Sequence, residues 1–194
     1  MSPLSDATLR ADARRNRKTV LATAVTLLAE RPQATMQEIA DASGLGRTTV
    51  YRHFPRRRDL IDALFVEVVR EARAAVAEVV ARPQPAHDVL CALGPKFIEI
   101  GDRYRFLDAH PELRERALNT RADPGDPLTA FLADAQARGE VRPDVPVVWM
   151  LTALRGLTVA AIVELAAGRL AVEDAGRLLG TTFARAFAAA PSGK

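Results

Sequence analysis

Hydrophobic residues recur every three or four positions along most of the chain, and no segment shows the alternation typical of a β-strand. The periodic segments predict helices near residues 6–30, 35–43, 46–53, 57–80, 87–101, 103–109, 111–120, 127–138, 146–167 and 172–189. One of the clearest apolar stripes runs from Leu60 to Val80. The predicted fold class is therefore all-α.

Particular residues predict where these helices begin and end. The sequence TMQE at 35–38 is a capping box, in which a threonine hydroxyl and a glutamate side chain bind each other's free backbone N–H groups. Gly44 suits the left-handed residue that ends a helix. Asp-Pro at 126–127 and Asp-Val-Pro at 144–146 predict two later helix starts, and Gly-Pro at 94–95 predicts a bend.

Two of the predicted helices are short and are joined by a turn that contains Gly44, which is the arrangement of a helix-turn-helix. Leu45 and Val50 are expected to face the core. The residues expected to point outward from the second helix are Arg47, Thr48, Thr49, Tyr51, Arg52 and His53. Arg47 lies near the N-terminus of that helix, where such helices contact base edges. Threonine, tyrosine and histidine side chains supply donors for phosphate oxygens.

Charge is distributed unevenly along the chain. Residues 1–60 hold 11 Lys and Arg against 6 Asp and Glu, whereas residues 61–194 hold 16 against 18. Four basic residues lie between positions 14 and 18, and three arginines follow one another at 56–58. A basic first third favours a polyanion partner, with a solvated charged surface as the alternative interpretation.

Residues 35–64, TMQEIADASGLGRTTVYRHFPRRRDLIDAL, together with the basic helix before them, resemble the TetR (tetracycline-repressor) family of bacterial transcription regulators. The resemblance implies an N-terminal three-helix DNA-binding domain over 1–60, a linking helix at 57–80, and a helical effector-binding and dimerisation domain over 61–194. It also implies a homodimer on a palindrome-like double-stranded DNA operator. By the same resemblance Thr35, Thr49, Tyr51 and His53 contact phosphates, and Arg47 and Thr48 lie nearest to bases. Arg57, which occupies the position of a family lysine at the start of the linking helix, is expected to contact a DNA phosphate as well.

The resemblance further implies a small-molecule pocket and a dimer interface in the second domain. Aromatic residues are concentrated in that domain, and the candidates for a small, largely apolar effector are Phe97, Tyr104, Phe106, His110, Phe131, Trp149, Met150 and Leu154. For any one of them an ordinary place in the core is the alternative. The expected interface residues, on the last two helices, are Leu157, Ala161, Leu179, Phe183 and Phe187.

Other chemistry has little support in the sequence. The three histidines fall in separate predicted elements, so we expect no metal site, and no nucleotide-binding or hydrolase motif occurs. We expect no cofactor and no enzymatic activity. The single cysteine, Cys91, and the absence of an apolar leader predict a cytoplasmic protein. Residues 147–163 are apolar but carry Arg155, which favours a helix covered by protein on most sides over a membrane span.

The sequence therefore predicts a dimeric transcriptional regulator, most simply a repressor released from its operator by a small effector. A DNA-binding regulator without a small-molecule effector is the first alternative. A helical ligand-binding protein, or an enzyme with an unrecognised site, is the second.

Overall fold

The computed structural model describes residues 3–118 and 125–189. Its chain divides into two compact units, Met1–Glu67 and Val68–Lys194. Within the described residues the regular structure is helical, and one isolated antiparallel bridge joins Val141 to Ala188. The predicted all-α class is confirmed.

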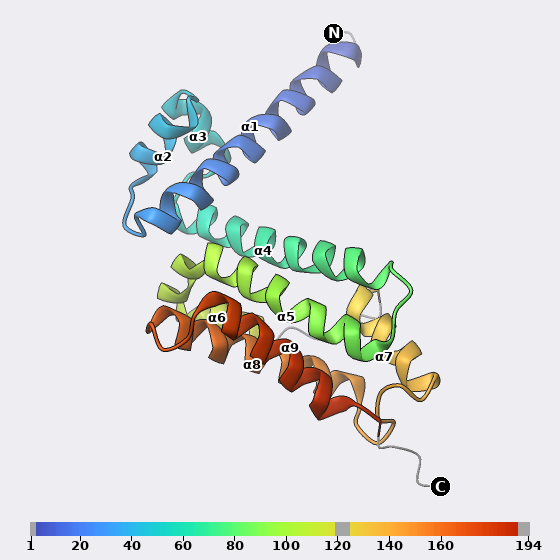
Figure 1. Cartoon of the computed structure of the whole chain (residues 1–194). Coiled ribbons are helices and arrows are strands. Elements are labelled where there is room, and N and C mark those ends of the chain that lie inside the picture. The colour runs from blue at the N-terminus through green and yellow to red at the C-terminus, as the bar shows by residue number, and fades with distance from the viewer. Residues whose placement is uncertain (1–2, 119–124, 190–194) are drawn as a thin grey trace, which may run out of the picture. The chain divides into compact units, whose positions relative to one another are not determined.

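The first unit is built from α1 (Pro3–Glu30), α2 (Met36–Ser43), α3 (Arg47–His53) and the beginning of α4 (Arg57–Val80). The last three turns of α1 pack on α2 and α3, while its earlier half continues beyond them (Figure 1). The buried side chains of this small core come from the four helices and the segments between them, and they are Val20, Leu21, Ala24, Val25, Leu28, Ala34, Met36, Ile39, Ala40, Val50, Phe54, Leu60, Ile61, Leu64 and Phe65.

The second unit contains the rest of α4, followed by α5 (Ala86–Arg103), a 3-10 helix η1 (Arg105–Ala109), α6 (Pro111–Leu118), α7 (Pro127–Ala137), α8 (Val147–Ala166) and α9 (Val172–Phe187). Helices α5, α8 and α9 lie side by side (Figure 1). The predicted helix positions are confirmed to within a few residues. The last two residues of the helix predicted at 111–120 lie outside the described residues.

Helices α5 and α9 approach each other unusually closely through three glycines. A Cβ atom built on Gly94 would lie 2.3 Å from the carbonyl oxygen of Gly176, and one built on Gly180 would lie 2.4 Å from that of Cys91. The bend predicted at 94–95 does not interrupt α5, which continues through Pro95. Gly94 instead lets the backbone of α9 come into contact, so no space for a ligand is left there.

Helix α8 consists mostly of apolar residues, yet only Met150, Leu151 and Leu154 are buried. The expectation that protein covers it on most sides is therefore wrong for the single chain. The length and apolar composition of α8 would also suit a membrane-spanning helix, but core helices of soluble proteins can have the same length and composition. The start predicted from residues 144–146 also differs, because Asp144 pairs with Arg142 and the residue before the helix is Pro146.

The start predicted at 126–127 is confirmed. The Asp126 side chain accepts a hydrogen bond from the backbone N–H of Leu128 at 3.0 Å, and Pro127 is the first residue of α7. Proline is tolerated at this position because its missing N–H would have no partner within the helix.

Candidate nucleic-acid interface

The predicted capping box fixes the beginning of α2. The Thr35 hydroxyl accepts a hydrogen bond from the Glu38 N–H at 3.2 Å, and the Glu38 carboxylate accepts from the Thr35 N–H at 2.7 Å. Arg31, which sequence reasoning overlooked, donates to the same carboxylate at 3.1 Å. These hydrogen bonds, the backbone one from Thr35 first, lower the pKa of Glu38. The cap places Thr35, an expected phosphate contact, on the surface at a helix N-terminus.

The turn between α2 and α3 requires glycine at one position. Gly44 has φ 68°, in the left-handed region, and its N–H donates to the carbonyl of Asp41 at 3.3 Å. An added Cβ would meet no atom within 4 Å there, so the requirement is conformational rather than steric. The Ser43 hydroxyl donates to the Ala40 carbonyl at 2.8 Å and accepts from the Leu45 N–H at 3.3 Å, which closes the turn.

Helix α3 has a single fully buried side chain, Val50. Leu45, in the turn, is half-buried. The helix is held at its far end by Phe54, which is 2% exposed and whose N–H donates to the Val50 carbonyl at 2.9 Å. Two apolar anchors thus fix the helix and leave its other side to solvent, which confirms that Val50 faces the core.

The exposed side of α3 carries Arg47, Thr48 and Arg52, with Thr49 and Tyr51 half-buried beside them. The guanidinium of Arg47 lies over the Tyr51 ring, 5.3 Å from its centroid. This stacking holds a planar, charged group in a defined direction at the beginning of the helix. A guanidinium presented in this way can make two parallel hydrogen bonds to guanine in the major groove.

His53 is less available than the sequence suggested. Its Nε2 is enclosed by protein and has no hydrogen-bond partner among the described residues. Burial lowers the pKa of His53, and the neighbouring Arg52 and Arg17 lower it further. His53 is therefore neutral near pH 7, and its enclosed Nε2 is not available to a phosphate.

Arg57 makes intramolecular contacts that the sequence did not reveal. Its guanidinium donates hydrogen bonds to the carbonyl oxygens of Ala34 and Pro32, the latter at 2.8 Å. It therefore ties the start of α4 to the loop before Thr35. Next to it, Arg56 pairs with Asp59 at 3.0 Å, and Arg58, 3.8 Å from Asp62, keeps a side chain that is 80% exposed.

Sequence reasoning also missed Arg17 of α1. Its guanidinium lies over the Phe54 ring, 5.4 Å from the centroid, so a basic residue of α1 contacts the end of α3. The signal available in the sequence was the position of Arg17, three residues before the first buried residue of α1.

The expected effector residues do not gather at one site in the second unit. Met150 and Leu154 are buried in the core of that unit, and Phe97 and Phe131 are partly buried residues packed against the same core. Tyr104 and Phe106 form another pair, with ring centroids 6.0 Å apart. The side chain of His110 lies 3.4 Å from Glu112, and Trp149 is 61% exposed.

Arg155 lies in the middle of α8 and is half-buried. Burial lowers its pKa, opposed by the charge of Asp126, so Asp126 is its acidic neighbour. Asp126 itself is 3.3 Å from Arg73. The Nε of Arg155 is enclosed and has no hydrogen-bond partner in the described part of the chain.

The expected interface residues also fall into two groups. Leu179, Phe183 and Phe187 are 4%, 1% and 6% exposed in the single chain, where they pack in the core of the second unit. They are thus core residues, because this side of α9 faces α5. Leu157 and Ala161 are half-buried. The exposed apolar residues on α8 and α9 are Val148, Trp149, Val163, Val172 and Leu178.

The first unit has the geometry of a helix-turn-helix DNA-binding domain, and comparison with known proteins agrees. Residues 20–64 match the model of the bacterial regulatory proteins of the tetR family. The chain is 30% identical, over 136 residues, to the HTH-type transcriptional repressor LfrR of Mycolicibacterium smegmatis, covering 70% of this chain and 71% of the relative. The chain belongs to the TetR family and is a DNA-binding transcriptional regulator.

Solved structures support the same fold across both units. The structure of LfrR from Mycobacterium smegmatis in complex with proflavine matches with a TM-score of 0.61 and 25% identity, covering 88% of this chain and 94% of that one. The structure of RolR with resorcinol matches with a TM-score of 0.68 and 18% identity, covering 93% and 91%. The second likeness concerns the fold alone.

Proposed function

We propose that this protein is a cytoplasmic, non-enzymatic repressor that binds its operator as a homodimer and is released by a small molecule. The observation that carries the proposal is the exposed, arginine-bearing side of α3, held by Val50 and Phe54 in a chain that shares 30% identity with a transcriptional repressor. In this proposal Arg47 and Thr48 read bases, and Thr35, Thr49 and Tyr51 position the helix on the backbone.

The operator test uses the DNA that flanks the protein's own gene. Fluorescence anisotropy should show tighter binding to one flanking fragment than to random DNA of the same length, and transcription from that fragment should fall when the protein is added. The double variant Arg47→Ala, Thr48→Ala should lose the preference and keep weak binding. Equal affinity for all fragments would contradict sequence-specific repression, and increased transcription would indicate an activator.

Dimerisation is supported by the apolar surface that α8 and α9 leave uncovered. One recognition helix contacts too few base pairs to select a site in a genome, so two copies on a palindrome-like operator are expected. Val163 and Leu178 are 38% and 41% exposed on two helices that pack against each other. A second copy that covers them would remove apolar area from water, at about 25 cal/mol per Å².

The dimer test compares an exposed pair with an exposed control. Val163→Glu with Leu178→Glu should yield a folded monomer with weakened operator binding, as measured by light scattering and anisotropy. Val66→Glu is the control, because Val66 is 55% exposed on α4 and outside this surface. A double variant that remains dimeric would place the interface elsewhere.

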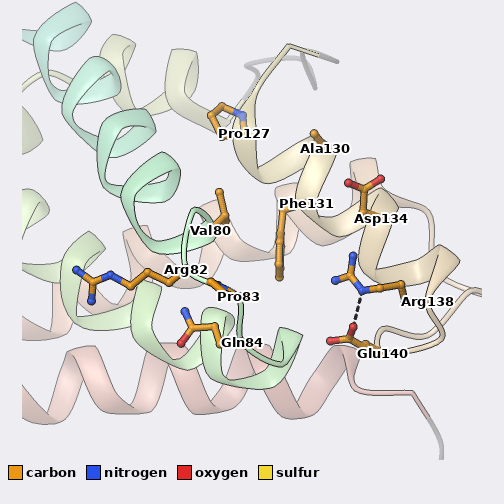
Figure 2. Close-up of a pocket in the computed structure, with 10 residues that line it drawn as sticks. All are labelled: Val80, Arg82, Pro83, Gln84, Pro127, Ala130, Phe131, Asp134, Arg138 and Glu140. Atoms are coloured by element: carbon orange, nitrogen blue, oxygen red, sulfur yellow. Dashed lines mark hydrogen bonds and ion pairs between the residues drawn. The ribbon is translucent and has the colours of Figure 1, made fainter.

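The effector is proposed to bind the second unit at a hollow beside Phe131. The hollow has a volume of about 560 Å³, within the range of roughly 300–1,000 Å³ common for small-molecule sites. In Figure 2 the Phe131 ring points from α7 into this space, between Val80 and Pro83 on one side and the ion pair of Arg138 with Glu140 on the other. An aromatic face with a few charged groups around it suits a small, largely apolar molecule that carries one polar group.

A thermal-shift screen followed by titration tests this site. A ligand at about 100 times its dissociation constant should raise the free energy of unfolding by roughly 2.7 kcal/mol and should release the operator. Phe131→Ala should weaken binding of the ligand, and Tyr104→Phe, which removes the 2.8 Å hydrogen bond from the Tyr104 hydroxyl to Glu71, is the matched control. If only Tyr104→Phe weakened ligand binding, the site would lie near Tyr104, between α5 and η1. Hits that bind and never release DNA would favour the regulator without a small-molecule effector.

A further inference from the structure

Residues 8–19 of α1 have no buried side chain. All of them are exposed apart from the half-exposed Ala13 and Asn16, and Val20, the next residue, is buried. At a rise of 1.5 Å per residue these twelve residues extend the helix by about 18 Å. Helices in water depend largely on packing of an apolar side, so this segment lacks the usual source of stability.

The same segment is strongly basic on one side. It carries five Arg and Lys residues and one acid, Asp12. Arg10, Arg14, Arg17 and Lys18 follow one another at spacings of four, three and one, which places them on one side of a helix. Arg15 lies on the other side, 3.5 Å from Asp12. Arg14 and Lys18 are like charges four residues apart on this side, so they repel each other, and phosphate groups beside them would relieve that repulsion.

The basic side is continuous with the helix-turn-helix. Arg17, its member nearest the core, lies over the ring of Phe54, the residue that ends α3. The basic side therefore begins at the end of the recognition helix and follows α1 outward from the three-helix core. Each strand of DNA carries a phosphate about every 3.4 Å of helix axis, so a helix of this length can lie beside several phosphates.

We propose that residues 8–19 of α1 form a second DNA-binding element, which binds backbone phosphates flanking the segment read by α3. This inference rests on the DNA binding of the first unit and adds a separate contact surface to it. Phosphate contacts of this kind increase affinity for every sequence and do not select bases. Residues 8–19, called the α1 arm below, should therefore increase the affinity of the protein for DNA and the steepness with which salt weakens that binding.

The experiment uses the full chain with Arg10, Arg14 and Lys18 replaced together by Gln, which keeps helix propensity and leaves Arg17 on Phe54. Binding is measured by anisotropy between 50 and 200 mM salt. Each lost phosphate contact should reduce the slope of log affinity against log salt by about 0.9, and affinity at 0.1 M salt should fall about tenfold or more. The preference for one DNA sequence over another should not change.

Two control variants separate the arm from net charge and from folding. Replacing Arg82, Arg105 and Arg116 by Gln removes the same charge from exposed positions of the second unit, and Arg15→Gln changes the other side of α1. Both should keep the wild-type slope, and circular dichroism should show all variants folded. A triple variant on α1 that keeps the wild-type slope would overturn the proposal, as would an equal loss in the second-unit variant.

Hydrogen exchange gives an independent result. Amides of residues 8–19 should exchange quickly in the free protein and slowly on DNA in the wild type, and they should stay fast in the α1 triple variant. Any duplex serves, because backbone contacts do not depend on sequence. If no preferred operator were found, the proposed repressor function would be contradicted, but the binding of residues 8–19 to DNA could still be tested in this way. Unchanged exchange on bound DNA would overturn the arm alone.

Discussion

Arg57 donates a hydrogen bond to the carbonyl oxygen of Ala34, a residue 23 positions earlier in the chain. A second hydrogen bond reaches Pro32 at 2.8 Å, so one side chain closes the loop that leads into α2. The next residue of that loop is Thr35, which caps α2. Arg57, which was expected from the sequence to contact phosphate, thus also holds the loop beside Thr35, the other expected phosphate contact.

Replacing Arg57 should therefore reduce stability as well as DNA binding. Arg57→Ala is expected to lower the free energy of unfolding by about 1–2 kcal/mol, because two carbonyl groups lose a charged donor. Arg58→Ala, on an 80% exposed side chain, should change it by less than about 0.5 kcal/mol. Urea unfolding of both variants provides the measurement. If Arg57→Ala and Arg58→Ala were equally stable and only Arg57→Ala lost DNA binding, Arg57 would contact phosphate without stabilising the loop.

Arg47 and Arg52 should differ in their effect on specificity. Arg47→Ala is expected to remove about 1–3 kcal/mol of discrimination at one base pair of each half-site, because a stacked guanidinium can bind guanine through two hydrogen bonds. Arg52→Ala should weaken all sequences by a similar factor. The measurement is competition binding across operators with single base changes. If the two variants weaken specific and random DNA alike, Arg47 does not contact bases.

The enclosed ring of His53 should make the first unit less stable in mild acid. Its pKa lies below the ordinary value of 6.5, so just below that pH the unfolded chain takes up a proton that the folded chain does not. Stability should thus be complete above about pH 6.5, fall as pH decreases, and stop falling below the folded pKa. His53→Gln should flatten this dependence between pH 7.5 and 5.5. Parallel pH curves for His53→Gln and the wild type would contradict the assignment.

The contact between α5 and α9 should be sensitive to a single methyl group. Gly180→Ala would place a Cβ 2.4 Å from the Cys91 carbonyl oxygen and should cost about 1–3 kcal/mol of stability. Gly156→Ala has no atom within 4 Å in the single chain and should add roughly 0.5–1 kcal/mol, because alanine favours the helix. Guanidinium unfolding measures both. A loss at Gly156 would show that atoms absent from the single chain lie against it.

Much of the fold followed from local sequence. The capping box at Thr35, the left-handed Gly44 and the proline after Asp126 are governed by backbone hydrogen bonds within a few residues, so each could be predicted from the neighbouring residues alone. The helix-turn-helix and its exposed residues on α3 followed for the same reason, because helical periodicity assigns residues to a side.

Which residues pack against each side of a helix depended on the tertiary structure. Phe183 and Phe187 have the spacing of a helix interface, and only the packing of α9 on α5 shows that the other helix belongs to the same chain. The carbonyls that receive Arg57 lie more than 20 residues away, and the glycines that bring α5 and α9 together carry no side chain that a periodic pattern could register. Helical spacing specifies a direction from an axis, whereas the partner found in that direction depends on contacts between segments distant in sequence.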